Sequence, residues 1–389
     1  MRMPLTIFTP TYQRAVRLPR LYASLQAQTV KSFEWIVIDD GGMDETPELV
    51  RAWAASETAF PIRFQKIAHG GKHRAINHAV EMAEGEAFFI VDSDDALYPD
   101  AVEHVLAWFA EIADDPQFAG VSGLGTFFDG TTNGGDGDGR VVDATNLERE
   151  EKHLLGDKAE VYKTSVHRKY PFPEIPGEDF LTEAVVWDAI AADGYKLRWY
   201  PVPIYYCEYL PDGLSRGRTN KMLENPRGYL EWFRVRKACH ALTPSILEEC
   251  LIWYAYFEGT PLKMEMDAEV RTEIQRRCKC MSEAMIKYVS EHGIRTIALY
   301  GIGKYGQALL RLLNRWGMQP AYLLDRKKIA QQGDIPVYSP DELLPQRADA
   351  VFVSLKNKDA ALETTLAKTY PFVVFLMDFW RKLPSPQQD

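Results

Sequence analysis

Five aspartates follow two short apolar runs and could form a polar site, with a divalent cation bound at the DSDD segment. The runs FEWIVI and FFIV are rich in β-branched and aromatic residues, which is typical of buried strands. Carboxylates at the ends of two such strands repel one another unless they bind something. A Mg²⁺ or Mn²⁺ ion held by one or two carboxylates keeps open positions that phosphate oxygens fill. The acids are Asp39, Asp40, Asp92, Asp94 and Asp95.

The DSDD segment also allows two other interpretations. It could be a solvated turn, because aspartate is common in turns. It could begin a calcium loop, with Asp92 and Asp94 at positions 1 and 3 and Glu103 at position 12. Ala96 and Leu97 argue against calcium, since they stand where such a loop has a ligand and a glycine.

Glycines follow the first acidic pair. Gly41 and Gly42 let the chain turn sharply, so Asp39 could accept a hydrogen bond from a ribose hydroxyl or a base N–H. The alternative is that these acids cap the helix expected near Glu45. Asp44 is better placed for that role.

A basic segment, HGGKHRAINHAV, predicts a helix that starts directly after two glycines. Lys72, His73 and Arg74 would lie at its N-terminus, which suits an anionic phosphate. A solvated basic helix face is an equally good interpretation for His73 and His78. It fits Lys72 less well, because Lys72 stands next to the glycines.

A second acidic pair, Glu178 and Asp179, follows Gly177. The apolar residues after it recur at helical spacing, at Phe180, Ala184, Trp187 and Ile190. We therefore expect the two acids to open this helix, where its dipole favours negative charge.

Strand and helix patterns alternate through the first hundred residues. We predict strands at residues 3–10, 33–40, 62–68 and 86–92, with helices at 17–28, 45–56 and 72–85. This order predicts an α/β fold with a doubly wound, mostly parallel sheet. Ligands of such sheets bind beyond the carboxyl ends of the strands, where the five aspartates stand.

At this point the chain resembles the family 2 glycosyltransferases with the GT-A fold. The resemblance rests on FTPTYQR, VIDDGGMDET, GGKHRAINHAV, FFIVDSDDALYPD and PGEDFLTEAVVWD, in that order, and covers residues 1 to about 215. It implies transfer of a sugar from a nucleotide-sugar, expected to be a UDP-sugar, with Mn²⁺ or Mg²⁺ and inversion at the anomeric carbon. The implied acceptor is a hydroxyl of a glycan or lipid-linked molecule in surface polysaccharide synthesis.

The resemblance also implies roles for individual residues. Asp179 would be the catalytic base, paired with Glu178, and Asp94 would contact the metal. The donor would be bound by Thr9, Pro10, Tyr12, Asp39, Asp40, Lys72, Asp92, Ser93 and Asp95.

One position departs from the family pattern, and one segment has no role assigned by the resemblance. Many members have an arginine where this chain has Ile76, before Asn77, so Lys72 or Arg74 could take over the phosphate contact. Glu208 and Asp212 follow the acidic pair in YYCEYLPDG. They could help bind metal or acceptor, and a surface turn is an equally good interpretation.

The C-terminal part predicts a second domain. Three regions are expected: residues 1–218 as the GT-A domain, 219–290 as a helical linker and 291–389 as a small Rossmann-like domain. The last has the dinucleotide-binding spacing in LYGIGKYGQALL, followed by an acid after the next strand. The residues of this second nucleotide site would be Gly301, Gly303, Gly306 and Asp325. The alternative function is therefore an NAD(P)- or nucleotide-sugar-dependent oxidoreductase or epimerase.

Composition narrows the class of protein. The 389 residues carry a net charge of −10, which argues against general nucleic-acid binding. Five cysteines in a chain of this length do not form a disulfide framework, and no signal peptide is recognised. We expect a cytoplasmic protein, with peripheral association at the inner face of the membrane and homo-oligomerisation both left open.

Overall fold

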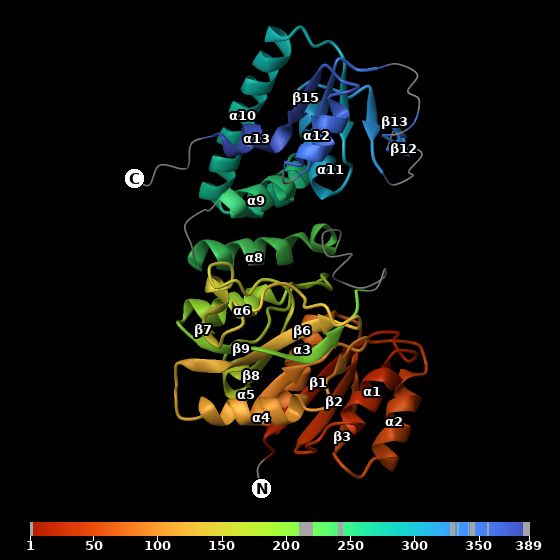
Figure 1. The fold of residues 1–389 in the computed structure, drawn as a ribbon, viewed down its shortest axis with the longest axis vertical. Helices are drawn as coiled ribbons and strands as arrows, with labels where there is room; N and C mark the ends of the chain where they lie inside the picture. Colours follow the sequence, from red (N-terminus) through yellow and green to blue (C-terminus); the bar gives the residue numbers. More distant parts are fainter. Residues whose placement is uncertain are drawn as a thin grey trace. The chain divides into compact units, whose positions relative to one another are not determined.

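The computed structural model describes residues 3–209, 221–239, 244–326, 331–332, 334–340, 342, 347–355 and 358–383. The chain forms two compact units, Met1–Cys239 and His240–Asp389 (Figure 1). The helices of the expected linker are divided between them. Helix α8 (Pro226–Cys239) belongs to the first unit, and α9 (Pro244–Phe257) and α10 (Ala268–Glu291) belong to the second.

The first unit is built on one sheet, for which the described residues provide nine strands in the order β3-β2-β1-β4-β8-β6-β9-β5, with β7 paired to β9. The strands are β1 (Leu5–Thr11), β2 (Phe33–Asp39), β3 (Ile62–Lys66), β4 (Ala87–Ile90), β5 (Ala96–Leu97), β6 (Phe118–Phe127), β7 (Val142–Ala144), β8 (Lys158–Lys163) and β9 (Lys196–Cys207). Apart from α8, the α-helices with bounds in the described residues are α1 (Leu18–Gln26), α2 (Thr46–Ser56), α3 (Lys72–Met82), α4 (Ala101–Glu111), α5 (Thr164–Lys169) and α6 (Ala184–Ala192).

Strands β1 to β4 are parallel, as predicted, but the complete sheet is mixed. Strand β8 runs antiparallel to both β4 and β6, and β9 runs antiparallel to β5 and β7. Antiparallel neighbours need no crossover helix, so the alternation that revealed the parallel half is missing after α4. The α/β class is confirmed, with a mixed sheet in place of a mostly parallel one.

The parallel register brings the ends of β1 to β4 to one edge of the sheet. Thr11 pairs with Asp39, and Asp39 pairs with Lys66 on β3. On the other side of β1, Phe8 pairs with Ile90, the last residue of β4. The segments after β1, β2 and β4 therefore leave the sheet at the same edge.

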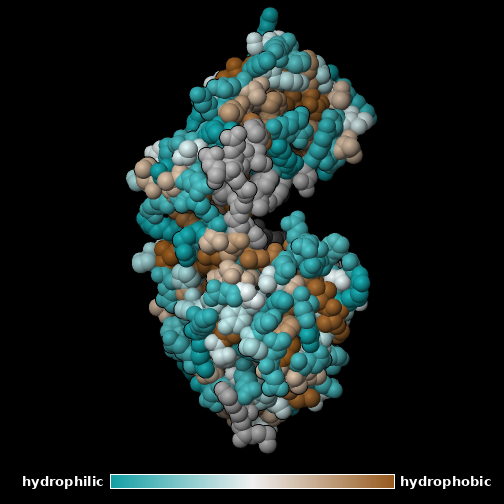
Figure 2. All heavy atoms as spheres, turned by 90° about the vertical axis from the view of Figure 1, so that its left-hand side faces the viewer, coloured by the Kyte–Doolittle hydropathy of each residue, from teal (hydrophilic) through white to brown (hydrophobic). Residues whose placement is uncertain are grey.

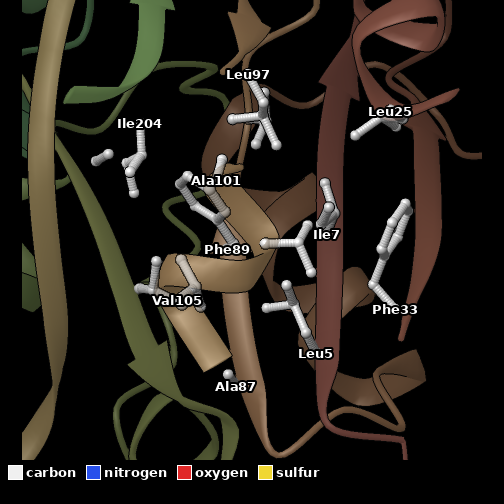
Figure 3. Packing of buried hydrophobic residues seen from close by; sticks show 14 of the residues in the cluster. Leu5, Ile7, Leu25, Phe33, Ala87, Phe89, Leu97, Ala101, Val105 and Ile204 are labelled. Carbon is white, nitrogen blue, oxygen red and sulfur yellow. The ribbon is translucent and has the colours of Figure 1, made fainter. Parts of the chain in front are cut away.

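Apolar side chains cover both faces of this sheet because successive residues of a strand point to opposite sides. On one face, Ile7 of β1, Phe89 of β4 and Val105 of α4 gather in one buried cluster (Figure 3), which also contains residues of α1 and α2. On the other face, Phe8 and Phe88 lie in a cluster with α3, α5, α6 and α8. Both layers fix the strands from which the acids at the edge emerge.

His167 is buried in the second cluster and should make stability depend on pH. Its ring is 1% exposed and lies 5.1 Å from the ring centroids of Phe88 and Trp187. Within the described residues its Nε2 has no hydrogen-bond partner. Burial lowers the pKa of His167 to about 3, so the folded protein keeps the ring neutral.

Acidification should therefore destabilise the first unit through His167. The unfolded chain binds this proton below about pH 6.5, whereas the folded chain does not, so stability falls as pH falls through that value. Between pH 6.5 and 5 the loss should be about 2 kcal/mol. Denaturant unfolding at pH 7 and pH 5 should show a smaller loss for His167→Phe, with His104→Gln on α4 as the control. An equal loss in wild type and His167→Phe would contradict the assignment.

The second unit contains a smaller sheet. Its described strands lie in the order β12-β13-β11-β10-β14-β15; five are parallel, and β12 is antiparallel to β13. The strands are β10 (Ile297–Tyr300), β11 (Tyr322–Leu324), β12 (Gln331–Gln332), β13 (Ile335–Tyr338), β14 (Ala350–Val353) and β15 (Phe372–Phe375). The helices besides α9 and α10 are α11 (Lys304–Arg315), α12 (Ala360–Leu366) and α13 (Leu376–Arg381).

Hydrophilic side chains cover most of the face shown in Figure 2. Within the described ranges, we find no helix that combines the length and the hydrophobicity needed to cross a bilayer.

Candidate active site

Asp39 ends β2 as a buried carboxylate with one unsatisfied oxygen. Its Oδ1 accepts a hydrogen bond from the Gly42 N–H at 2.8 Å. Its Oδ2 lies 3.7 Å from the Lys66 ammonium and has no hydrogen-bond partner in the described part of the chain. Burial raises the pKa of Asp39, because the charged form is poorly solvated there. The oxygen is buried, so the predicted contact of Asp39 with a nucleotide stays a prediction.

Asp40 is engaged by the protein itself. Its two carboxylate oxygens accept hydrogen bonds of 2.8 Å from the N–H groups of Gly70 and Gly71. His69 adds a contact of 2.9 Å from Nδ1 to Asp40 Oδ2. Asp40 therefore holds the turn that leads into α3, and its predicted contact with a donor stays a prediction.

Of the three residues predicted from FTPTY, Tyr12 has its side chain at the exposed edge. Thr9 is fully buried, and its Oγ1 accepts a hydrogen bond from Trp35 Nε1 at 3.0 Å. Pro10 is buried within β1. Tyr12 is 44% exposed and stacks on His69, with ring centroids 4.4 Å apart.

Lys72 lies at the start of α3 between two carboxylates. Its ammonium is 2.6 Å from Asp92 Oδ1 and 2.7 Å from Glu183 Oε1. Burial alone would lower the pKa of Lys72, but the charges of Asp92 and Glu183 outweigh it and raise the pKa. The Lys72 ammonium thus links α3 to the DSDD segment and to the segment after Asp179.

Arg74, the other candidate for a phosphate contact, holds the chain instead. Its guanidinium donates hydrogen bonds of 2.8 Å to the carbonyl oxygens of Ile175 and Glu178. His73 is 3% exposed, so a solvated helix face is the wrong interpretation for it. Burial and then the charge of Arg74 lower the pKa of His73 to about 4. Lys72 remains the phosphate candidate at this helix.

The DSDD segment presents one partly exposed carboxylate pair and one buried acid. Burial, and then the charge of Asp92, raise the pKa of Asp94. Asp95 accepts hydrogen bonds from Tyr205 Oη at 2.6 Å and from the Glu208 N–H at 2.9 Å, and burial raises its pKa to about 8. Ser93, which lies between Asp92 and Asp94 in the sequence, is 6% exposed.

These residues fit a cation that leaves most of its coordination positions open. In the described ranges we find no group of three His, Cys, Asp or Glu side chains arranged to enclose a metal. The mutual repulsion of Asp92 and Asp94 would fall if a cation bound at Asp94. One or two carboxylates with the remaining positions open is the arrangement usual for Mg²⁺ or Mn²⁺ on phosphates.

Glu208 pairs with Arg20 at 2.8 Å and so has a partner within the protein. Arg20 also donates a hydrogen bond to the carbonyl oxygen of Asp94. This arrangement ties the end of β9 to the DSDD segment. Asp212 lies outside the described residues.

Glu178 and Asp179 do not open a helix, so that prediction is wrong. Helix α6 begins at Ala184, and both acids lie in a segment without regular structure. Glu178 instead accepts hydrogen bonds from the N–H groups of Arg227 at 2.9 Å and Gly228 at 2.7 Å, in the first turn of α8. A carboxylate there satisfies helix amides that have no partner within the helix.

Asp179 is held by the segment just before α8 and stays partly exposed. Asn225 donates to its Oδ1 at 3.1 Å and accepts from its N–H at 2.7 Å. Lys221 Nζ lies 3.5 Å from Asp179 Oδ2, and the Asp179 side chain is 38% exposed. Burial alone would raise the pKa of Asp179, but the Asn225 hydrogen bond and the charge of Lys221 bring it below its usual value. Asp179 is therefore an ionised, accessible carboxylate.

His69 is a site residue that the sequence analysis missed. Its Nε2 lies 3.7 Å from Asp179 Oδ2, while Nδ1 faces Asp40. Gly41 permits this, since a Cβ there would lie 2.7 Å from the backbone N of His69. The only available signal was a histidine directly before the two glycines of HGGK.

The glycine loop of the second unit has the expected strand–turn–helix context between β10 and α11. A Cβ at Gly306 would lie 1.9 Å from the carbonyl oxygen of Gly301, so Gly306 permits close packing, whereas Gly303 faces open space. Asp325 accepts a hydrogen bond from the Ile302 N–H at 2.8 Å. Nucleotide binding at this loop stays a prediction.

Comparison with known proteins supports the first unit's resemblance. Residues 6–132 match the family model for glycosyl transferase family 2. A chondroitin synthase from Pasteurella multocida (strain Pm70) is 36% identical over 109 residues, which are 28% of this chain and 11% of that protein. The putative glycosyltransferase EpsH from Bacillus subtilis (strain 168) is 29% identical over 101 residues, 26% of this chain and 29% of that protein. The matched part spans less than a third of either relative.

Among solved structures, S. aureus TarS 1–349 in complex with UDP-GlcNAc aligns with 82% of this chain and 84% of its own. The TM-score is 0.50 at 15% identity, so this likeness concerns the fold. The family match over residues 6–132 identifies this part of the first unit as a glycosyltransferase family 2 domain, and the mixed sheet and the likeness to TarS agree with the GT-A fold.

Proposed function

We propose that the first unit transfers a sugar from a nucleotide-sugar to a hydroxyl group of a glycan or lipid-linked acceptor. The observation that carries this proposal is that an ionised, accessible Asp179 lies beside the sheet edge where Asp39 and the DSDD segment emerge. We call this edge the acid edge. The carbonyl oxygen of Asp179 lies against Gly71, the residue before Lys72, and Lys72 pairs with Asp92. The Asp179 carboxylate, the Lys72 ammonium and the DSDD segment therefore lie along one connected set of contacts.

The donor's nucleoside would contact the ends of β1 and β2. The unpartnered Oδ2 of Asp39 would accept a base N–H, and the exposed ring of Tyr12 offers a flat apolar surface. A UDP-sugar is the donor we propose, which agrees with the UDP-GlcNAc held by the TarS structure.

The diphosphate would contact Lys72 and a cation held by Asp94. A bound Mn²⁺ or Mg²⁺ would stabilise the negative charge of the leaving diphosphate. Lys72 would contribute a second positive charge once phosphate oxygens compete with Asp92 for its ammonium.

Asp179 would remove the proton of the acceptor hydroxyl. The acceptor oxygen would then bond to the anomeric carbon while the bond to the diphosphate breaks and its electron pair leaves with the phosphate. One base and one displacement give inversion without a covalent enzyme intermediate.

Polysaccharide synthesis is the process we propose, in agreement with the chondroitin and hyaluronan synthases among the relatives. All five cysteines are free thiols, which agrees with the proposed cytoplasmic location. When the acceptor is lipid-linked, the protein would act at the inner face of the membrane.

Nucleotide-sugar turnover tests this proposal. The purified chain should release UDP from UDP-GlcNAc or UDP-glucose in the presence of Mn²⁺, with water or an added chondroitin oligosaccharide as acceptor. EDTA should stop the release. Absence of nucleoside diphosphate release from UDP- and GDP-sugars under all these conditions, with NAD(H) conversion at 340 nm instead, would contradict it in favour of an oxidoreductase.

A further inference from the structure

His69 lies between the carboxylates of Asp40 and Asp179. Its Nδ1 is 2.9 Å from Asp40 Oδ2 and 3.0 Å from the Asp40 carbonyl oxygen. Its Nε2 is 3.7 Å from Asp179 Oδ2. The ring stacks on Tyr12 at 4.4 Å, and its side chain is 42% exposed.

These contacts fix where the ring carries its proton. Both oxygens facing Nδ1 are acceptors, so Nδ1 keeps its hydrogen in the neutral and the charged ring. Nε2 therefore faces Asp179 either with a lone pair or, in the charged ring, with an N–H.

We propose that His69 is the positioning residue of the base, holding the Asp179 carboxylate and taking from it the proton that it removes from the acceptor. This inference rests on the proposed function. The acceptor O–H bond breaks, its oxygen bonds to the anomeric carbon, and the diphosphate leaves with the electron pair of the broken bond. The proton passes to Asp179, then to Nε2, and leaves to solvent from the exposed ring.

The surroundings explain why Asp179 benefits from such a partner. Asn225 and Lys221 stabilise its charged form, which makes it a weak base near neutral pH. Nε2 of His69 has a lone pair in the neutral ring and can accept the proton from Asp179. Among the described residues, the polar and titratable groups around this pair are Tyr12 after β1, Asp40 after β2, His73 and Arg74 of α3, and Lys221 and Asn225 before α8.

Nuclear magnetic resonance of ¹⁵N-histidine-labelled protein tests the geometry without any substrate. The His69 signals are assigned with His69→Gln, whose exposed position should tolerate the change. We expect the Nδ1–H tautomer in wild type and, in Asp179→Asn, a changed ¹⁵N chemical shift of Nε2, because the carboxylate that faces it is replaced by an amide. An Nε2–H tautomer, or an Nε2 shift unchanged by Asp179→Asn, would overturn the proposal.

UDP release from UDP-GlcNAc tests the consequence for the reaction. We expect His69→Gln to lower kcat about tenfold, with an altered acid limb of its pH profile and an unchanged KM for UDP-GlcNAc. His104→Gln should leave both unchanged. A wild-type kcat and pH profile in His69→Gln would overturn the proposal even if the resonance result is as expected. Loss of the proposed function itself would be seen separately, as an inactive wild type.

Discussion

Asp179→Asn should reduce sugar transfer about a thousandfold while donor binding is retained. The amide cannot accept the proton of the acceptor hydroxyl, but it keeps the size of the side chain. Asn225 still bonds the backbone N–H of residue 179, so the segment should keep its place. Transfer is measured as nucleoside diphosphate release at saturating donor, and donor binding by titration calorimetry.

Asp193→Asn provides the matched control for this substitution. Asp193 follows α6 and contacts Tyr170 and Lys169 at the surface, so its amide variant should transfer sugar at the wild-type rate. If Asp179→Asn stays within a few-fold of wild type, Asp179 is not the base. Glu178 could not take over as the base in that case, since its two oxygens already accept hydrogen bonds from the backbone N–H groups of α8.

Gly71→Ala should cost both stability and activity. Gly71 has φ 97° and ψ 158°, a conformation that residues with a Cβ avoid at a cost of about 1–3 kcal/mol. Its Cβ would also lie 1.8 Å from the carbonyl oxygen of Asp179. The chain must therefore move away, and the base with it. We expect a loss of about 3 kcal/mol in the free energy of unfolding and at least a tenfold loss of kcat.

Gly194→Ala separates the two causes. Gly194 has φ 85°, but its Cβ would meet no atom within 4 Å. This variant should therefore lose about 1 kcal/mol from backbone strain alone and keep the wild-type kcat. Equal losses of stability and activity in the two variants would show that the close contact between Gly71 and Asp179 has no special role.

The parallel half of the fold and the acid edge could be predicted because their signals are local. An apolar run followed directly by Asp39 or Asp92 marks both a strand and its end, and parallel pairing then brings the ends together. The actual contacts of the acids depend on partners far along the chain. Glu178 accepts a hydrogen bond from α8, about fifty residues later in the chain. The helical spacing after Glu178 could not reveal this partner, and it placed the start of α6 at Glu178 instead of Ala184.

His69 and Arg74 show the same limit. The carbonyl groups bonded by Arg74 lie about a hundred residues away, and nothing in GGKHR distinguishes a phosphate contact from this clamp. His69 reaches Asp179 over a similar separation, and only the assembled fold brings the two together. Residue types were sufficient to place carboxylates at this edge of the sheet, but not to predict which other residues hold them.

Thermal unfolding with UDP, with and without Mn²⁺, tests the central claim most directly. At concentrations near 100 times the dissociation constant, UDP with Mn²⁺ should raise the melting temperature of wild type by about 5 °C. UDP without metal should do less, and Asp94→Asn should lose the metal-dependent part. The account would be contradicted if NAD alone stabilised the protein, or if UDP stabilised wild type and Asp94→Asn equally whether or not Mn²⁺ was present.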